Sequence, residues 1–342
     1  MTELLTPVEV AAGWQLVEST ASLQHVRPLA DAARRVITEA QSGRVQLGFQ
    51  PFDNEMRGMS PGHLAFITGY AHSAKTLLML NMVVHNAGRR IALFTPDEPA
   101  PLVLVKLASM VFEIPVAELE RRVANYDPEG LRLVHETVDY FPNLLIFDRP
   151  ISARIMRACY EEAREVWSED ADLVVLDYLD LLQAGDLSGR ADAVKAFASD
   201  FEVPLVVLHQ TSRSAGSKGQ TMRIDSGNFG GETWATFQLG VRRKRAAIEA
   251  EIEDLTHRAD RPQWVVDRIA FLTHERLVHE YTVTVNLTKN KRPGGRLVGE
   301  VDFELDHATG ALRPLGGDLP RQYLRHHSHL RVVEDDEREA RW

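Results

Sequence analysis

The sequence has little that would suit secretion, a membrane or a disulfide-stabilised domain. Cys159 is the single cysteine among 342 residues, so no intrachain disulfide can form, which fits a reducing compartment. No apolar run reaches the ~18–20 residues that a membrane span needs. The first residues also lack the basic-then-apolar pattern of an export signal. We therefore expect a cytoplasmic protein that does not associate with a membrane.

The sequence also lacks an excess of basic residues. Lys and Arg number 39 against 49 Asp and Glu, so the formal net charge is −10. This net negative charge argues against a protein whose whole surface binds nucleic acid. Basic residues gather instead in two short runs, 242–245 and 289–292. Contact with nucleic acid is therefore expected only at a few loops, where it would be sensitive to salt.

The segment with the clearest chemical meaning is GYAHSAKT, which follows a strand-like run at 63–68 and precedes an apolar, helix-like run. A strand, a glycine-initiated loop, Lys-Thr and a helix are the layout of a phosphate-binding loop. Backbone N–H groups and the helix N-terminus would face the phosphates. Lys75 would contact the terminal phosphates, and Thr76 would bind Mg²⁺. The predicted nucleotide-binding residues are Gly69, Tyr70, Ala71, His72, Ser73, Ala74, Lys75 and Thr76.

One position of this loop departs from the consensus. Ala74 stands where a glycine normally precedes the lysine, and glycine relieves crowding where backbone meets phosphate. Alanine is the smallest replacement, so we interpret the segment as a variant P-loop. The alternative is a chance match in an ordinary strand–helix turn.

Between residue 48 and about residue 317, short apolar runs alternate with segments of helical periodicity. Such runs are expected for strands buried on both faces of a parallel sheet. The expected strands are 63–68, 90–95, 144–148, 173–177 and 204–209. The expected helices are 75–86, 100–112, 152–165 and 191–199. This repeat predicts a doubly wound α/β sheet with its site at the carboxyl ends of the strands.

Four other segments complete the expected organisation. Residues 241–277 are highly charged and predict a helical insertion that projects from the core. The runs 281–288 and 297–305 flank a Pro-Gly-Gly turn and predict a closing β-hairpin. We expect a helical N-terminal arm at 1–45, the α/β domain at 46–317 and a polar C-terminal tail at 318–342.

Acidic residues follow two of the expected strands. Asp177 ends an apolar strand, where a carboxylate beside a P-loop would hold Mg²⁺ in the Walker B role. Asp180, shortly after it, is a weaker candidate for this role and is interpreted as a capping residue. Asp97 and Glu98 follow the second strand, and either could orient or deprotonate an attacking water. The alternative for Asp177 is a surface aspartate that caps the next turn, and for Asp97 and Glu98 it is an acid-rich helix N-terminus.

Two further segments carry candidate residues. Gln210 follows the strand at 204–209 and is expected to sense the γ-phosphate. The basic, glycine-rich loop after it is a candidate DNA contact or a plain surface loop, and its predicted DNA-binding residues are Arg213, Lys218 and Arg223. The hairpin turn carries Lys289, Lys291 and Arg292. These could complete the site of a neighbouring subunit, like an arginine finger, or form only a solubilising turn.

Five segments, in order, resemble the ATPase domain of DnaB-type replicative helicases of the RecA-like superfamily. They are GMSPGHLAFITGYAHSAKTLLMLNM, LFTPDEP, LVVLDYLDLL, VPLVVLHQTSR and TVNLTKNKRPGGRLVGEVDFELDHATGALRPL. Together they span roughly residues 45–315. The resemblance implies a RecA-like fold and an ATP hydrolase that uses Mg²⁺ to drive a DNA helicase. It also implies a homo-hexameric ring around single-stranded DNA and contacts with other replication proteins.

The resemblance places Asp97 in the register of the family's catalytic glutamate and Gln210 at its sensor glutamine. Ala74, Asp97 and Lys291 depart from the family's pattern, as does His209, which replaces a small polar residue. Residues 241–277 are additional to the pattern, and residues 1–45 do not resemble the family's helical N-terminal domain. A divergent, phage-encoded version would fit these departures. The alternatives are an ATP-binding switch or loading protein with little turnover, and a recombinase-like repair ATPase.

Overall fold

The computed structural model describes residues 44–211, 231–258 and 260–315. The predicted N-terminal arm and C-terminal tail lie almost wholly outside these residues, so both domain boundaries stay predictions. In the described part of the chain, no helix is long and apolar enough to cross a membrane.

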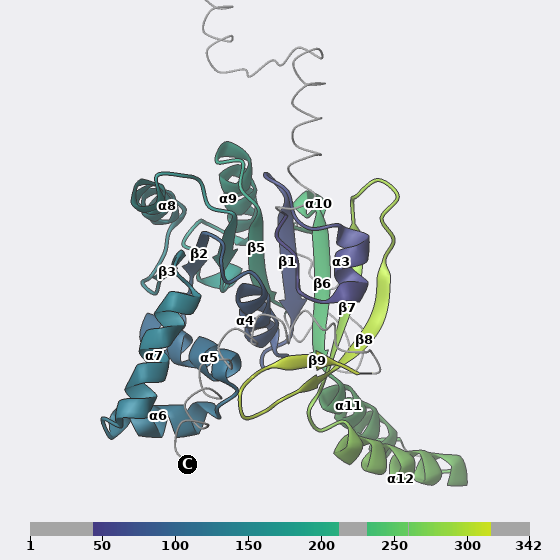
Figure 1. Ribbon diagram of the computed structural model, residues 1–342. Helices are drawn as coiled ribbons and strands as arrows, with labels where there is room; N and C mark the ends of the chain where they lie inside the picture. Colours follow the sequence, from purple (N-terminus) through teal and green to yellow (C-terminus); the bar gives the residue numbers. More distant parts are fainter. Residues whose placement is uncertain (1–43, 212–230, 259, 316–342) are drawn as a thin grey trace, which may run out of the picture. The chain divides into compact units, whose positions relative to one another are not determined.

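A nine-stranded sheet of the described residues organises the fold, in the order β3-β2-β4-β5-β1-β6-β7-β8-β9 (Figure 1). The neighbouring strands among β1 to β6 pair in parallel. The pairs β6–β7, β7–β8 and β8–β9 are antiparallel. The strands are β1 Leu64–Gly69, β2 Ile91–Phe94, β3 Leu144–Phe147, β4 Leu173–Leu176, β5 Leu205–Gln210, β6 Phe237–Arg243, β7 Thr282–Asn290, β8 Val298–Leu305 and β9 Leu312–Pro314. The sheet is therefore mostly parallel with a closing hairpin, as predicted.

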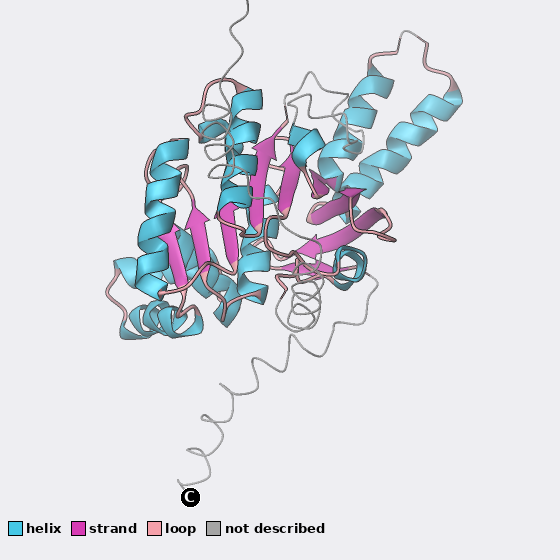
Figure 2. Cartoon of the chain, turned by 90° about the horizontal axis from the view of Figure 1, so that it is seen from above, coloured by secondary structure: helices cyan, strands magenta, loops and turns pink. Residues whose placement is uncertain are grey.

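Helices cover both faces of the parallel strands (Figure 2). In β1, Ala65 and Ile67 belong to one apolar core, which also includes residues of α4, while Leu64 and Phe66 belong to a second core with residues of α8 and α9. The helices are α3 Gln50–Met56, α4 Lys75–His85, α5 Ala100–Phe112, α6 Val116–Ala124, α7 Pro128–Tyr140, α8 Ala153–Trp167, α9 Leu187–Asp200, α10 Gly231–Trp234, α11 Lys244–Thr256 and α12 Gln263–Val278, with a 3-10 turn, η1, at Leu179–Leu181. Two cores on two faces define a doubly wound sheet.

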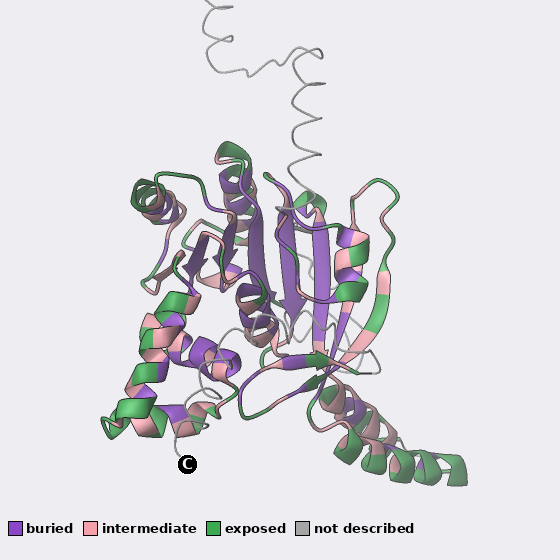
Figure 3. Cartoon of the chain, in the orientation of Figure 1, coloured by how far each residue is buried: buried purple, intermediate pink, exposed green. Residues whose placement is uncertain are grey.

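The helical insertion begins later than predicted. Residues 241–243, expected to start it, finish β6 instead, and the helical hairpin α11–α12 runs from Lys244 to Val278. In β6, Phe237, Leu239 and Val241 alternate toward the core, but Gly240 and the arginines that follow obscure this period in the sequence. The burial colours show the hairpin projecting from the core, with α12 mostly exposed and α11 mostly of intermediate exposure (Figure 3).

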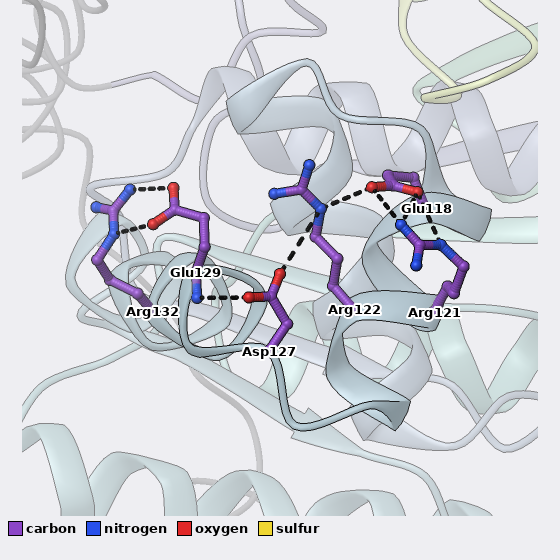
Figure 4. A network of polar contacts seen from close by, with 6 residues as sticks. All are labelled: Glu118, Arg121, Arg122, Asp127, Glu129 and Arg132. Carbon is purple, nitrogen blue, oxygen red and sulfur yellow. Dashed lines mark hydrogen bonds and ion pairs between the residues drawn. The ribbon is translucent and has the colours of Figure 1, made fainter.

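Helices α6 and α7 were not predicted individually. A chain of surface contacts joins them, in which Glu118 accepts from both Arg121 and Arg122, and Arg122 also faces Asp127 (Figure 4). Arg132 pairs with Glu129 on α7. Exposed pairs of this kind add little stability, so the small apolar cluster of Val105, Ala108, Leu119 and Leu133 holds α5, α6 and α7 together.

The antiparallel return of β7 separates two candidate sites. The phosphate loop follows Gly69 at the carboxyl end of β1. Asn290, at the end of β7, pairs with Phe237 at the start of β6, which in turn pairs with Ala65 near the start of β1. The basic turn therefore lies at the amino-terminal edge of the parallel strands, opposite the phosphate loop (Figure 1).

Candidate nucleotide-binding site

The phosphate loop starts at a position that only glycine can occupy. Gly69 lies in register with Gln210 of β5, and its carbonyl accepts from Thr211 N–H at 3.1 Å. A Cβ atom on Gly69 would come within 2.4 Å of Ser73 Oγ and 2.5 Å of the Val241 carbonyl. Contacts that short force the backbone to move, so the tight turn depends on this glycine.

Ala74 has a backbone conformation that favours glycine. It is the N-cap of α4, with φ 76° and ψ 24°, which is the left-handed region. His72 in the same loop also has a positive φ of 60°. An L-residue in this region costs about 1–2 kcal/mol. The loop therefore holds a left-handed alanine just before Lys75 at an energetic cost that glycine would avoid.

Lys75 and Thr76 lie at the start of α4, as the motif predicts. The Lys75 ammonium donates to the carbonyls of Gly69 at 3.0 Å and Tyr70 at 2.7 Å. Burial lowers the pKa of Lys75 to about 8, although the Asp177 and Asp180 carboxylates act to raise it. The ammonium is therefore held within the loop that would surround the phosphates.

Thr76 and Asp177 meet directly. The Thr76 hydroxyl donates to Asp177 Oδ2 at 2.9 Å, so the side chains of the two predicted metal ligands are in direct contact. Burial raises the pKa of Asp177 to about 6; the Thr76 bond and Lys75 lower it, whereas Asp97 and Glu98 raise it. A divalent cation would favour the ionised carboxylate here, and hydroxyl and carboxylate oxygens are the ligands that Mg²⁺ prefers.

These two residues alone would not form a complete metal cage. Among residues 44–211, 231–258 and 260–315, no group of three or more His, Cys, Asp and Glu side chains could hold a metal ion. Mg²⁺ commonly binds through one or two protein ligands together with phosphate oxygens and water. The donor set therefore fits a magnesium–nucleotide complex better than a free metal ion.

Comparison with known proteins identifies the family of the chain. The family model of the DnaB-like helicase C terminal domain matches residues 44–224. The chain belongs to this family. The replicative DNA helicase DnaB of Pasteurella multocida (strain Pm70) is 23% identical over 207 residues, which are 55% of this chain and 44% of that protein. The chain spans less than half the length of the curated relatives it matches first.

Two solved structures share the fold at low sequence identity. The first, an ATPase domain, superposes with a TM-score of 0.65 at 16% identity, covering 86% of this chain and all of that one (100%). The second is a DnaB-like replicative helicase, described together with its interactions with primase. It superposes with a TM-score of 0.60 at 16% identity and covers 90% of this chain and 71% of that chain. These similarities confirm the RecA-like α/β fold of the DnaB-like domain.

Asp97 and Glu98 of the DnaB-like domain have different surroundings. Glu98 forms an ion pair with Lys106 of α5, so its carboxylate already has a cationic partner. Asp97 is exposed. β2 pairs with β4 up to Phe94 and Leu176, so the segment after β2 lies beside Asp177, and both carboxylates act to raise the pKa of Asp177. Lys106 was not predicted, because no motif signals an ion pair between a loop and the second turn of a helix.

Asp180 does not cap the following helix, contrary to the interpretation from the sequence. Asp186 caps α9 instead, accepting from Gly189 N–H. Asp180 Oδ2 contacts His209 Nδ1 at 3.2 Å and accepts from Gln210 N–H at 3.3 Å. The sensor candidate Gln210 therefore has a partner in the segment that follows β4.

The basic turn of the DnaB-like domain is not brought to its own phosphate loop. Lys291 donates to the Thr233 carbonyl at 2.8 Å, and Lys289 reaches the same oxygen at 3.5 Å. Arg292 donates at 3.1 Å to the Met56 carbonyl, at 2.7 Å to that of Gly58 and at 3.0 Å to Ser60 Oγ. Arg292 thus connects the turn to the end of α3 through hydrogen bonds. Lys291, in contrast, is exposed.

The predicted DNA-binding residues Arg213, Lys218 and Arg223 lie outside the described residues. Their role stays a prediction.

Proposed function

We propose that this chain is an ATP-dependent DNA helicase or translocase of the DnaB-like type. ATP hydrolysis with Mg²⁺ would drive movement along single-stranded DNA, within a homo-hexameric ring. The observation that carries the proposal is the Thr76–Asp177 hydrogen bond of 2.9 Å beside Lys75, in a chain of this family. One structurally similar DnaB-like helicase interacts with primase, so other replication proteins are proposed as partners.

Each residue of the site has a proposed role. Lys75 would leave the Gly69 and Tyr70 carbonyls and donate to the terminal phosphates, while backbone N–H groups of the loop bind the remaining oxygens. Thr76 would bind Mg²⁺ directly and Asp177 through water; Mg²⁺ supplies charge neutralisation of the phosphates. Asp97 would orient or deprotonate the attacking water, because Glu98 is paired with Lys106.

The test is steady-state ATP hydrolysis with and without single-stranded DNA. Lys75→Ala should abolish hydrolysis, whereas Lys195→Ala, on α9 away from the loop, should leave it unchanged. DNA should raise the native rate. Absence of hydrolysis in the native chain, with and without DNA, would contradict the proposal.

A nucleotide-dependent switch or loading protein is the second candidate. The left-handed Ala74 and the exposed Lys291 in place of a finger arginine favour it. A single-turnover assay with excess protein separates the two, because a switch binds ATP in a Lys75-dependent manner and leaves it intact.

A further inference from the structure

One carboxylate oxygen connects two strands of the site. Asp180 lies in η1 after β4, the strand that leads into Asp177. Its Oδ2 atom contacts His209 Nδ1 at 3.2 Å and accepts from Gln210 N–H at 3.3 Å. Since β4 and β5 are paired neighbours, this carboxylate fixes the end of β5 relative to the metal-binding segment.

The surroundings favour a charged Asp180. Burial acts to raise the pKa of Asp180, but the His209 hydrogen bond and charge, together with the Gln210 N–H, outweigh it and hold the pKa below its ordinary value. The His209 side chain is 3% exposed and that of Asp180 31%. Hydrogen bonds to charged groups contribute more than neutral ones, and a buried polar group left without its partner is costly.

The other side of this strand end is also held. Gln210 pairs in register with Gly69 of β1, and the next N–H, of Thr211, donates to the Gly69 carbonyl at 3.1 Å. The backbone at Gln210 is therefore fixed between the phosphate loop on one side and Asp180 on the other. A shift of Asp180 would move Gln210 relative to a nucleotide bound in the loop.

We propose that Asp180 and His209 form a positioning clamp that sets Gln210 for ATP turnover and does not itself hold the nucleotide. This inference rests on the proposed function, together with the expectation from the sequence that Gln210 senses the γ-phosphate. Asp180 and His209 are positioning residues, because they act through Gln210. Displacement of a catalytic group by about 1 Å can cost ~10²-fold in rate, so the clamp should affect kcat more than nucleotide affinity.

The kinetic test compares Asp180→Ala, Asp180→Asn and His209→Ala with the native chain. Asp180→Ala should lower kcat about 10- to 100-fold, with KM and the Kd for ATP within about twofold. Asp180→Asn keeps one acceptor oxygen, so it should lower kcat less than Asp180→Ala does. In the Asp180→Ala/His209→Ala double variant, the loss of kcat should be close to that of the worse single variant. Asp186→Asn, at the cap of α9, is the matched control and should leave kcat unchanged.

A second measurement does not depend on hydrolysis. Hydrogen exchange followed by mass spectrometry reports the Gln210 amide, which should exchange faster in Asp180→Ala and at the native rate in Asp186→Asn. If the native chain hydrolyses no ATP, the proposed function fails, and this exchange still decides whether the clamp exists. Unchanged exchange at Gln210, or a loss of ATP affinity equal to the loss of kcat, would overturn the inference.

Discussion

At the scale of single residues, Ala74 offers a test of how the loop shape is maintained. Its φ of 76° favours glycine, so Ala74→Gly should raise the free energy of unfolding by about 0.5–1 kcal/mol, as measured by urea denaturation. Ala71→Gly is the matched control in the same loop. Ala71 is not among the described residues with positive φ, so this change should leave stability unchanged or lower it. Effects of equal sign at both positions would refute the strain at Ala74.

The two acidic residues after β2 should differ in their contribution to turnover. Asp97→Asn should lower kcat by about 10²-fold or more, because the exposed carboxylate is the one available to water. Glu98→Gln should lower kcat far less. Lys106→Met should lower kcat by the same amount as Glu98→Gln, because Glu98 and Lys106 form one ion pair. Pre-steady-state and steady-state hydrolysis of the three variants decides the assignment. A greater loss in Glu98→Gln than in Asp97→Asn would reverse it.

At the scale of helices and strands, elements with a strong local pattern could be predicted from the sequence. The strands β1 to β5 read as short apolar runs, although β3 at the edge of the sheet is only half-buried, and α4 and α5 follow their turns directly. β6 could not be separated from the insertion, because Gly240, Arg242 and Arg243 interrupt its apolar alternation and its partners β1 and β7 are distant in sequence. The contacts of Asp180 with His209 and Gln210 could not be predicted from the sequence either, because they depend on the pairing of β4 with β5.

The hairpin α11–α12 should be removable without loss of the fold. It leaves the sheet at Arg243 and returns at Val283, which are paired, so an Asn-Gly turn between Lys244 and Thr282 can join the two strands in place of residues 245–281. Its buried residues on α12 are Val265 and Leu272, which leaves much of the helix exposed. We expect the free energy of unfolding to change by less than about 2 kcal/mol and ATP affinity to be retained. Thermal melting by circular dichroism and nucleotide titration measure both. Val265→Asp in the intact chain should disrupt the hairpin with the same outcome, and collapse of the melting transition in either would contradict its independence.

At the scale of the whole molecule, the order of motifs along the sequence was predictable, but their arrangement across the sheet was not. The basic turn follows the nucleotide motifs in the sequence, yet the antiparallel return of β7 places it at the opposite edge. Ala65 and Gly69 mark the two edges on β1, and four residues of strand at about 3.3 Å each separate them by about 13 Å. Lys291 therefore cannot complete the phosphate loop of its own chain without leaving the sheet.

This separation predicts that the turn acts between copies of the chain. Lys75→Ala lacks a working phosphate loop, and Lys291→Ala lacks the exposed basic residue of the turn, so each variant alone should hydrolyse ATP poorly. In a head-to-tail assembly, random mixing of equal amounts gives about a quarter of interfaces with both groups native. Co-expressed variants should therefore recover a measurable part of the native rate. The matched control mixes Lys75→Ala with the Lys75→Ala/Lys291→Ala double variant, which can form no complete site and should stay inactive. Recovery confined to the first mixture requires a site shared between subunits, whereas equal inactivity in both mixtures would contradict a shared site that contains Lys291.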